Sequence, residues 1–401
     1  MKKVCILNFT CSSNNWGLNA CSLSLKEEIL KHTNSVELID YSLIHSEYLF
    51  DHFSLFGKER FFPLGKYWIK RFFPKSLKIP RVCDEFRPLL DCWTKGDGGI
   101  NSNKIISSLA TSDIVYFNAE GSCYRKNYGA RTGLYLLWLS RVFLGKQAIF
   151  VNGNITVNSV DNVLQSMLLE CKSVGVDFVV RDKLSLKNMQ EMDLEVDYCP
   201  DSAFAAVNSR VQVSKSFDEK INGYGQYFCV SKSMLDMSQM PIGDTGLDAF
   251  ALFIRHIQQL TGWNPVFLAK DSEDLYIKKY VNLISGSHVA PEILGSAELL
   301  SVIRKCKLLV SGRYHHLIFG MCSGVPLLPL DTTSPKIRGL LVDTPYSNLI
   351  LDPTSLTNSL DKVQKLLSQV FLGHKVYDSY SDSKYRYLEF SSKIKSHLET
   401  P

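Results

Sequence analysis

Short runs of apolar residues alternate along the chain with longer segments whose apolar residues recur every three or four positions. In the first half the runs end in Gly, Asn or Asp, which is typical of strands. They predict strands at Val4–Phe9, Asp113–Asn118, Gln147–Asn152, Asp177–Val180 and Glu195–Cys199. The segment Leu18–Leu30 has the period of a helix. Strands separated by helices indicate parallel βαβ units and therefore an α/β fold.

The same alternation begins again after Gly223. Four strands are predicted in this half, at Tyr227–Val230, Pro265–Ala269, Lys307–Val310 and Val325–Leu330. One helix that Asp244 caps and Gly262 ends has an apolar face of Leu247, Phe250, Ala251, Ile254 and Ile257. Further helices are predicted at Ser296–Cys306, Tyr314–Ser323 and Ser383–Leu398.

The repeated pattern predicts two consecutive α/β domains with a cleft between them. Residues 1–207 form the predicted N-terminal domain and residues 223–380 the C-terminal domain. The polar stretch 208–222 is interpreted as a linker because it is rich in Ser, Lys, Asp, Asn and Gly. Residues 381–401 are interpreted as a C-terminal helix that folds back across the cleft.

The net charge of the chain is +5, but one segment carries more than all of it. Residues 53–81 contain eight Lys or Arg and one acidic residue, so the rest of the chain sums to −2. The net charge therefore gives no support to nucleic acid as a partner. Eight aromatic residues alternate with these cations, a composition that suits the surface of an anionic membrane. An insertion whose aromatic side chains face the domain core explains it equally well, and both interpretations stay open.

Cysteine spacing and hydropathy bear on the compartment. None of the eleven cysteines forms a CxxC pair, so the sequence predicts reduced thiols in a cytoplasmic protein and no zinc or redox motif. No apolar run reaches the roughly 20 residues that a membrane-spanning helix needs. Peripheral contact with the inner face of the plasma membrane depends on residues 53–81 alone.

The candidate catalytic residues lie where a predicted strand leads into a predicted helix, at Val310–His316. Ligands of open parallel sheets bind beyond the carboxyl ends of the strands, and a helix N-terminus attracts anions. Arg313 adds a cation of planar geometry that suits carboxylates and phosphates, and His315 can give a proton near neutral pH. Lys336 follows the next strand and is expected at the same sheet edge. Each residue alone fits a structural role, but together they favour a catalytic anion site.

Three segments near the C-terminus resemble the signature of the polysaccharide pyruvyltransferase family: Ser311–Phe319, Gly324–Pro326 and Pro335–Gly339. Weaker matches follow in the family's order at Asn14–Ala20, Asn118–Ser122, Val180–Ser185 and Pro200–Phe204. The resemblance implies two Rossmann-like domains in a GT-B-like arrangement. It also implies an enzyme that transfers pyruvate from phosphoenolpyruvate, as a ketal, onto a sugar of a bacterial surface polysaccharide (a capsule or exopolysaccharide) or its precursor.

By the same resemblance, His315 is the general acid, and Arg181, Arg313 and Lys336 bind the donor. Phosphoenolpyruvate carries a carboxylate and a phosphate, and its methylene carbon must be protonated to form a ketal, which agrees with fixed cations and a positioned acid. Candidate acceptor or loop contacts are Asn15, Trp16, Gly17, Glu120 and His316. The expected partners are phosphoenolpyruvate and a sugar or lipid-linked glycan, with no cofactor, no metal and no nucleic acid.

Two other functions stay open. In a glycosyltransferase of the same two-domain shape, Arg313 and Lys336 would hold the diphosphate of a nucleotide sugar and His315 would act as a base. A glycan- or lipid-binding protein that has lost its activity is the third interpretation. The joint presence of Arg313, His315 and Lys336 argues against that third interpretation.

Overall fold

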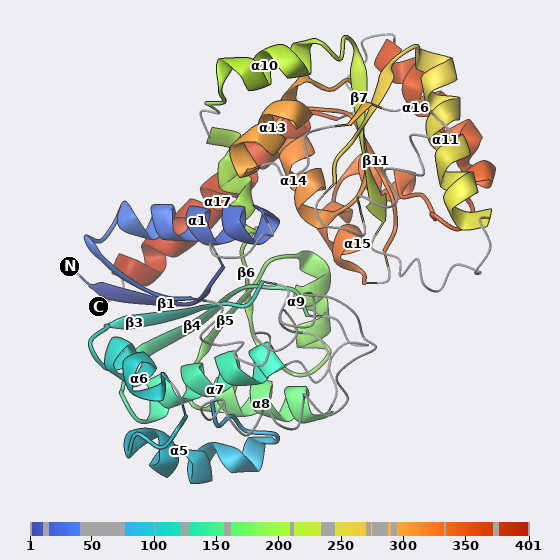
Figure 1. The fold of residues 1–401 in the computed structure, drawn as a ribbon. Helices are drawn as coiled ribbons and strands as arrows, with labels where there is room; N and C mark the ends of the chain where they lie inside the picture. The colour runs from blue at the N-terminus through green and yellow to red at the C-terminus, as the bar shows by residue number, and fades with distance from the viewer. Residues whose placement is uncertain are drawn as a thin grey trace, which may run out of the picture. The chain divides into compact units, whose positions relative to one another are not determined.

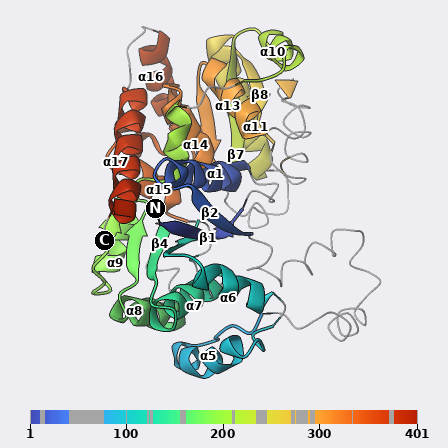
Figure 2. The same ribbon diagram turned by 90° about the vertical axis from the view of Figure 1, so that its left-hand side faces the viewer.

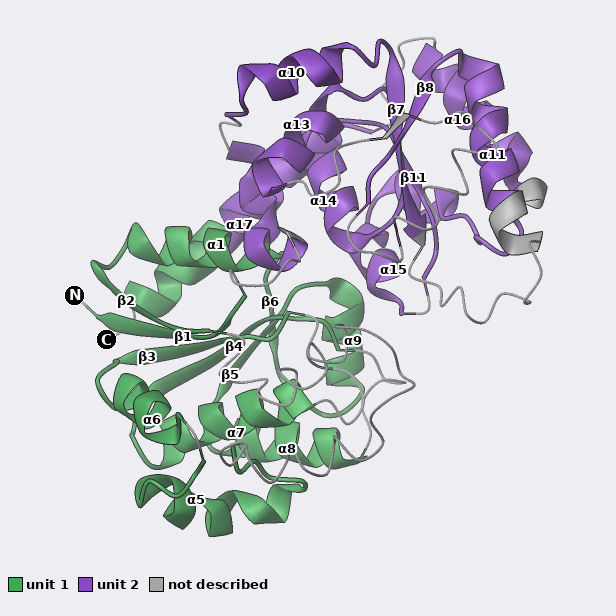
Figure 3. Cartoon of the chain, in the orientation of Figure 1, with its two compact units in different colours: residues 1–14, 21–201, 391–401 green, residues 15–20, 202–390 purple. Residues whose placement is uncertain are grey.

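The computed structural model describes most of the chain (Figure 1). The described residues are 2–10, 16–40, 77–99, 101–120, 123, 128–155, 162–208, 212–233, 245–269, 274, 288–289, 295–332, 334–371 and 377–399. They fall into two compact units (Figure 3). Unit 1 consists of Met1–Asn14, Cys21–Asp201 and Ser391–Pro401, and unit 2 of Asn15–Ala20 and Ser202–Phe390.

Unit 1 is built on a six-stranded parallel sheet with the strand order β2-β1-β3-β4-β5-β6. Its strands are β1 Lys3–Phe9, β2 Ser35–Asp40, β3 Ile114–Asn118, β4 Gln147–Gly153, β5 Asp177–Val180 and β6 Asp197–Tyr198. Its main helices are α5 Phe86–Thr94, α6 Ser102–Ala110, α7 Tyr128–Val142, α8 Asn162–Ser173 and α9 Lys183–Gln190. The strand order reverses between β1 and β3, which is the arrangement of a doubly wound fold.

The core of unit 1 lies between the sheet and α7. In Figure 2, α6, α7 and α8 lie side by side along one face of the sheet, and α5 lies beyond them. Gly133 of α7 permits the close approach, because a β-carbon there would lie 2.1 Å from the ring of Phe117 on β3. On its other side α7 packs against α5, where the rings of Tyr135 and Trp138 meet Phe86 edge-on at centroid distances of 5.4 and 5.3 Å. Burial of such aromatic surface is the main stabilising contribution here.

Unit 2 is built on a five-stranded parallel sheet with the order β11-β10-β7-β8-β9. Its strands are β7 Tyr227–Ser233, β8 Asn264–Phe267, β9 His288–Val289, β10 Leu309–Gly312 and β11 Leu327–Pro329. Its main helices are α10 Lys215–Asn222, α11 Thr245–Thr261, α13 Ser296–Lys305, α14 Tyr314–Cys322, α15 Lys336–Leu341 and α16 Leu360–Phe371. One apolar cluster unites the sheet with α13 and α14, and a second unites it with α11 and α16. The strand order reverses between β7 and β10.

Two helices contribute residues to both units. Helix α1 (Trp16–Leu30) gives its first residues to unit 2 and the rest to unit 1. Helix α17 (Ser379–Glu399) belongs to unit 2 up to Phe390 and to unit 1 from Ser391 onward. In Figure 1, α1 covers the face of the unit 1 sheet opposite α7.

The predicted strands and helices are found, with shifts of a few residues at their ends. The predicted linker over 208–222 is wrong, because α10 occupies most of it. Ser214 caps this helix by accepting a hydrogen bond from the Phe217 N–H at 3.2 Å, and Phe217 and Ile221 are buried in unit 2. The main segment of unit 2 also begins at Ser202 rather than after residue 222, because the apolar residues of the 3-10 helix Ser202–Asn208 pack into its core.

Of the basic and aromatic segment 53–81, only residues 77–81 lie within the described part of the chain, so both interpretations of it stay open. Asn15 and Asp244 also lie outside the described residues. Where positions are described, no helix has the length and apolar character needed to cross a membrane.

Candidate functional site

The sheet of unit 2 brings the ends of β7 and β10 together. The two strands pair in parallel, with Val310 opposite Val230 and Gly312 opposite Ser233. Lys232 on β7 and Arg313, which directly follows β10, therefore lie at the carboxyl ends of neighbouring strands. This is where the strand order reverses, the place at which open α/β sheets bind their ligands.

A network of buried hydroxyl groups ties the two strand ends to each other. Ser231 Oγ and Ser311 Oγ lie 2.6 Å apart, and Ser311 Oγ accepts the Arg313 N–H at 3.0 Å. His316 joins the network through Nδ1, which lies 2.9 Å from Ser231 Oγ. His316 is 1% exposed, so it is part of the interior of unit 2. That His316 contacts an acceptor remains a prediction.

Two cations share one carboxylate at this position. Arg313 Nη2 lies 2.6 Å from both carboxylate oxygens of Asp274, and Lys232 Nζ lies 3.4 Å from Asp274 Oδ1. The three side chains are each 7% exposed or less. Buried charges of this kind must be compensated, so Asp274 helps to hold both cations in the interior. Neither Lys232 nor Asp274 was predicted from the sequence.

His315 is the second residue of α14 and lies against the first turn of α1. A β-carbon on Gly17 would lie 2.4 Å from Nδ1 and 2.8 Å from Cγ of His315. On another side, the Tyr314 ring meets the imidazole edge-on at 5.2 Å. His315 as a whole is 9% exposed, so packing sets the orientation of its ring. Gly17 was predicted as a loop or acceptor contact. In the structure it lies beside His315, the residue predicted as the general acid.

Lys336 is the first residue of α15 and is half-buried. Helix α15 follows β11, and β11 pairs in parallel with β10. The carboxyl ends of these two strands therefore lie at one edge of the sheet, as the sequence predicts. That Lys336 contacts the same anion as Arg313 remains a prediction.

Arg181 belongs to unit 1, where it lies between two carboxylates. Its Nη1 is 2.9 Å from Asp201 Oδ2 and 3.2 Å from Glu120 Oε1. The side chains of Arg181 and Asp201 are fully buried, and that of Glu120 is 5% exposed. Arg181 and Glu120 were predicted separately, as donor and acceptor contacts, and the structure pairs them. Asp201 lies in a segment that the sequence analysis noted, but it was not selected.

The motif after β5 has a structural explanation. Asp182 caps α9 by accepting the Ser185 N–H at 2.8 Å, and Asn154 Nδ2 donates to Asp182 at 2.6 Å. An aspartate at this position is a favoured helix cap. The cap fixes the start of α9 directly beside Arg181.

A second polar cluster lies at the carboxyl ends of β1, β3 and β4 in unit 1. Asn8 Nδ2 donates to the Asn118 carbonyl at 2.6 Å, and Asn152 Nδ2 donates to Asn118 Oδ1 at 3.1 Å. Asn8 and Asn152 both have positive φ angles, a conformation that asparagine tolerates better than most residues. Asn118 ends its strand, and Asn8 and Asn152 each lie one residue before the end of theirs.

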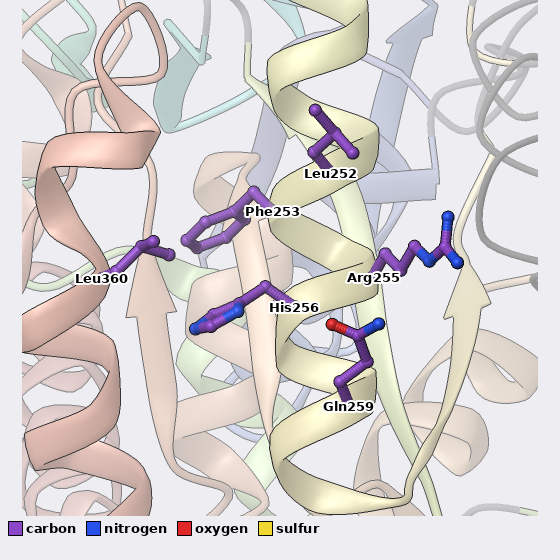
Figure 4. Close-up of a pocket in the computed structure, with 6 residues that line it drawn as sticks. All are labelled: Leu252, Phe253, Arg255, His256, Gln259 and Leu360. Atoms are coloured by element: carbon purple, nitrogen blue, oxygen red, sulfur yellow. The ribbon is translucent and has the colours of Figure 1, made fainter.

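Two further features of the described structure were compared with the predicted site: a hollow on α11 and the grouping of possible metal ligands. A hollow on α11 is lined by Leu252, Phe253, Arg255, His256, Gln259 and Leu360 (Figure 4). It contains none of the predicted site residues. Among the residues with described positions, no three His, Cys, Asp or Glu side chains gather as metal ligands would. The side chain of Trp16 lies outside the described part of the structure.

Comparison with known proteins gives a family and a fold. A model of the polysaccharide pyruvyl transferase family matches residues 19–334. No curated protein matches the chain by sequence.

Solved structures resemble the chain over its whole length. A putative UDP-N-acetylglucosamine 2-epimerase from Listeria monocytogenes has a TM-score of 0.60 at 14% identity, over 99% of this chain and 96% of its own. The UDP-GlcNAc 2-epimerase from Neisseria meningitidis, bound to UDP-GlcNAc, has a TM-score of 0.58 at 12% identity, over 99% of each chain. A trehalose-6-phosphate synthase has a TM-score of 0.55 at 10% identity, over 100% of this chain and 99% of its own. These likenesses, with the two parallel sheets, confirm the predicted fold class of two Rossmann-like domains of the GT-B kind.

Proposed function

Because the chain belongs to the polysaccharide pyruvyl transferase family, we propose that it transfers pyruvate from phosphoenolpyruvate to a sugar of a bacterial surface polysaccharide or its precursor, as a ketal. The observation that carries this proposal is the position of Arg313 and His315. A buried arginine at the carboxyl end of β10 directly precedes the helix that carries the histidine. This position supports anion binding by Arg313 and proton donation by His315, two residues further along the chain.

The donor requires fixed positive charge. Phosphoenolpyruvate carries a carboxylate and a phosphate, and Arg313 offers the planar geometry that both groups favour. Lys336 would add a second charge from the same sheet edge. The N-terminus of α14 would add the partial positive charge of the helix dipole.

Formation of the ketal requires that one carbon atom of phosphoenolpyruvate is protonated. His315 would give a proton to the methylene carbon of phosphoenolpyruvate, which becomes the methyl group of the product. The adjacent carbon then has oxocarbenium character, and a sugar hydroxyl attacks it and loses its own proton. A second hydroxyl of the sugar displaces phosphate and completes the ketal. Cations beside the phosphate would stabilise the negative charge that develops as it leaves.

Arg181 and Glu120 remain proposed contacts of the reactants. The guanidinium of Arg181 already binds Glu120 and Asp201. Both of these contacts are made by Nη1, one of the three nitrogens of the guanidinium. The contact with Glu120 also supports Arg181 as a residue that positions Glu120.

The experiment is a transfer assay with phosphoenolpyruvate and a panel of sugar glycosides. Product is detected by mass spectrometry as a gain of pyruvate less one water, together with release of inorganic phosphate. Run in D₂O, the reaction should give a product methyl group that carries one deuterium, because the proton comes from solvent through the acid. Phosphate release without deuterium in the product would contradict protonation at carbon.

A nucleotide-sugar glycosyltransferase is the second candidate. It is favoured by one observation, since structural neighbours are described as bound to UDP or UDP-GlcNAc. In that case Arg313 and Lys336 would hold a diphosphate. A panel of nucleotide sugars offered to the same glycosides distinguishes the two candidates.

A further inference from the structure

A buried network of hydrogen bonds joins Ser231, Ser311 and His316 in unit 2. Ser231 Oγ lies 2.6 Å from Ser311 Oγ and 2.9 Å from His316 Nδ1. Ser311 Oγ also lies 3.4 Å from His316 Nδ1. All three side chains are buried, and they come from β7, β10 and α14. The network therefore connects two strands and a helix at one point.

The network lies where the pairing of β7 with β10 is irregular. The register of the two strands shifts by one residue between Val310 and Gly312, so that Ser311 lies opposite two residues of β7. An extra residue in one strand disrupts the ladder locally and redirects the side chains beside it, and such bulges are common next to active sites. The shift comes directly before Arg313, so the hydroxyl groups connect the two strands at the place where the proposed donor-binding residue begins.

Ser311 links this network to the main chain of Arg313. Its Oγ accepts the Arg313 N–H at 3.0 Å. Arg313 is the N-cap residue of α14, so this hydrogen bond lies at the junction where the strand ends and the helix begins. The direction of the Arg313 side chain and the position of the first turn of α14, which carries His315, both depend on that junction.

The protons of the network follow from a count of donors and acceptors. The two serine hydroxyls each have one proton to donate, and the network offers the other hydroxyl and His316 Nδ1 as acceptors. If Nδ1 carried a proton, one hydroxyl proton would have no acceptor among the described members of the network. His316 is therefore neutral, with its proton on Nε2. Both hydroxyl protons are used inside the network, which leaves a lone pair of Ser311 Oγ for the Arg313 N–H.

We propose that Ser311 is a positioning residue of the donor site, which is held by Ser231 and His316 and fixes the Arg313 main chain for binding of phosphoenolpyruvate. This inference rests on the proposed function, since phosphoenolpyruvate is the donor in question. Ser311 is fully buried and acts through Arg313 rather than on the donor itself. Groups that are held in place in advance bind a ligand with less loss of conformational entropy.

Calorimetric titration with phosphoenolpyruvate tests this inference in Ser311→Ala, Ser231→Ala and the double variant that combines them. Ser311→Ala should weaken binding about tenfold, because it removes the hydroxyl that accepts the Arg313 N–H. Ser231→Ala should weaken binding less, because Ser311 still accepts that N–H. The double variant should bind no more weakly than Ser311→Ala, because both serines act through the same hydrogen bond. Losses that multiply in the double variant would show that the serines act independently, which overturns the inference.

Ser140→Ala is the matched control. Ser140 is a buried serine of α7 in unit 1, and its Oγ donates to the Leu136 carbonyl at 2.6 Å. Its replacement removes a buried hydroxyl that has no connection to Arg313. Thermal unfolding should show similar losses of stability in Ser140→Ala and Ser311→Ala, whereas only Ser311→Ala should lose donor affinity. An equal loss of affinity in both variants would mean that lower stability explains the effect, and positioning by Ser311 would be wrong.

The outcomes separate this inference from the proposed function. Wild-type affinity in Ser311→Ala overturns the role of Ser311 and leaves the proposed function standing. A wild-type protein that binds UDP but not phosphoenolpyruvate overturns the proposed function and this inference with it.

Discussion

Gly17 leaves no room for a β-carbon beside His315. An atom at that position would lie 2.4 Å from Nδ1, well inside the contact distance of two unbonded atoms. The first turn of α1 therefore forms one wall of the space that the imidazole occupies. A glycine that the sequence presents as part of a loop motif has its main effect on the orientation of a histidine almost 300 residues away.

Gly17→Ala should lower the turnover number at least tenfold, because the imidazole must rotate away from the added methyl group or α1 must shift. Overpacking of this kind costs about 1–3 kcal/mol of stability. The measurement is kcat for pyruvyl transfer together with the free energy of unfolding.

Gly295→Ala is the matched control. The nearest atom to a β-carbon on Gly295 is 3.9 Å away, so the same change meets no obstacle there. Normal activity in Gly295→Ala with a loss in Gly17→Ala supports the contact. Equal activity in both variants would show that Gly17 does not set the orientation of His315.

His315→Gln should impair turnover, whereas Arg313→Ala should impair binding of phosphoenolpyruvate. Loss of a general acid lowers turnover about 10²- to 10⁴-fold, so His315→Gln should bind phosphoenolpyruvate but convert little of it. Arg313→Ala should lose donor binding. Calorimetric affinity and kcat, measured on the same preparations, separate the two effects.

His316→Gln is the control for the choice of histidine. His316 is buried and bound to Ser231, so its replacement should act mainly on stability. A larger loss of turnover in His316→Gln than in His315→Gln would mean that the wrong histidine is assigned as the acid.

Arg181→Met should destabilise the protein by about 3–5 kcal/mol, because it leaves two buried carboxylates without their cation. Chemical denaturation monitored by fluorescence measures this loss. Lys95→Met serves as the comparison, since Lys95 pairs with Asp91 on the surface and exposed pairs contribute little. A similar small effect in both variants would contradict a central role for Arg181 in unit 1.

Acid should destabilise the protein through His397. Burial, with a smaller contribution from the charge of Lys393, lowers the pKa of His397 from 6.5 to about 4, and its Nδ1 lies 3.3 Å from the hydroxyl of Tyr116. The unfolded chain therefore binds a proton between about pH 6.5 and pH 4 that the folded protein does not, so stability falls as the pH drops through this window. The effect should amount to about 3 kcal/mol. Thermal unfolding of His397→Gln between pH 7.5 and pH 4 should show a smaller decline than the wild type, and equal declines would contradict this assignment.

Buried parallel strands were the easiest elements to predict, because both of their faces are covered. Six of the seven residues of β1 are buried, so the strand reads as one apolar run. β2 was missed because most of its residues are only half-buried and it contains Glu37 and Asp40. Helix α10 was missed because Phe217 and Ile221 are its only apolar residues.

Within the site, residues that are close in sequence were found and distant partners were not. Arg313 and His315 follow a strand and open a helix, which is a local signal. Lys232 could have been found by the same rule, because it comes two residues after the end of the predicted strand Tyr227–Val230. Asp274 and Arg313 are distant in the sequence and meet only in the folded chain, so no local sequence pattern predicts their pairing.

The most direct test of the donor is a thermal-shift titration of the wild-type protein with phosphoenolpyruvate, UDP, GDP and CMP. A ligand at 100 times its dissociation constant adds about 2.7 kcal/mol of stability, enough to raise the melting temperature by a few degrees. We expect phosphoenolpyruvate to protect the protein, Arg313→Ala to abolish the protection, and the nucleotides to have no effect. Protection by a nucleotide and none by phosphoenolpyruvate would contradict the pyruvyl donor and the role given to His315.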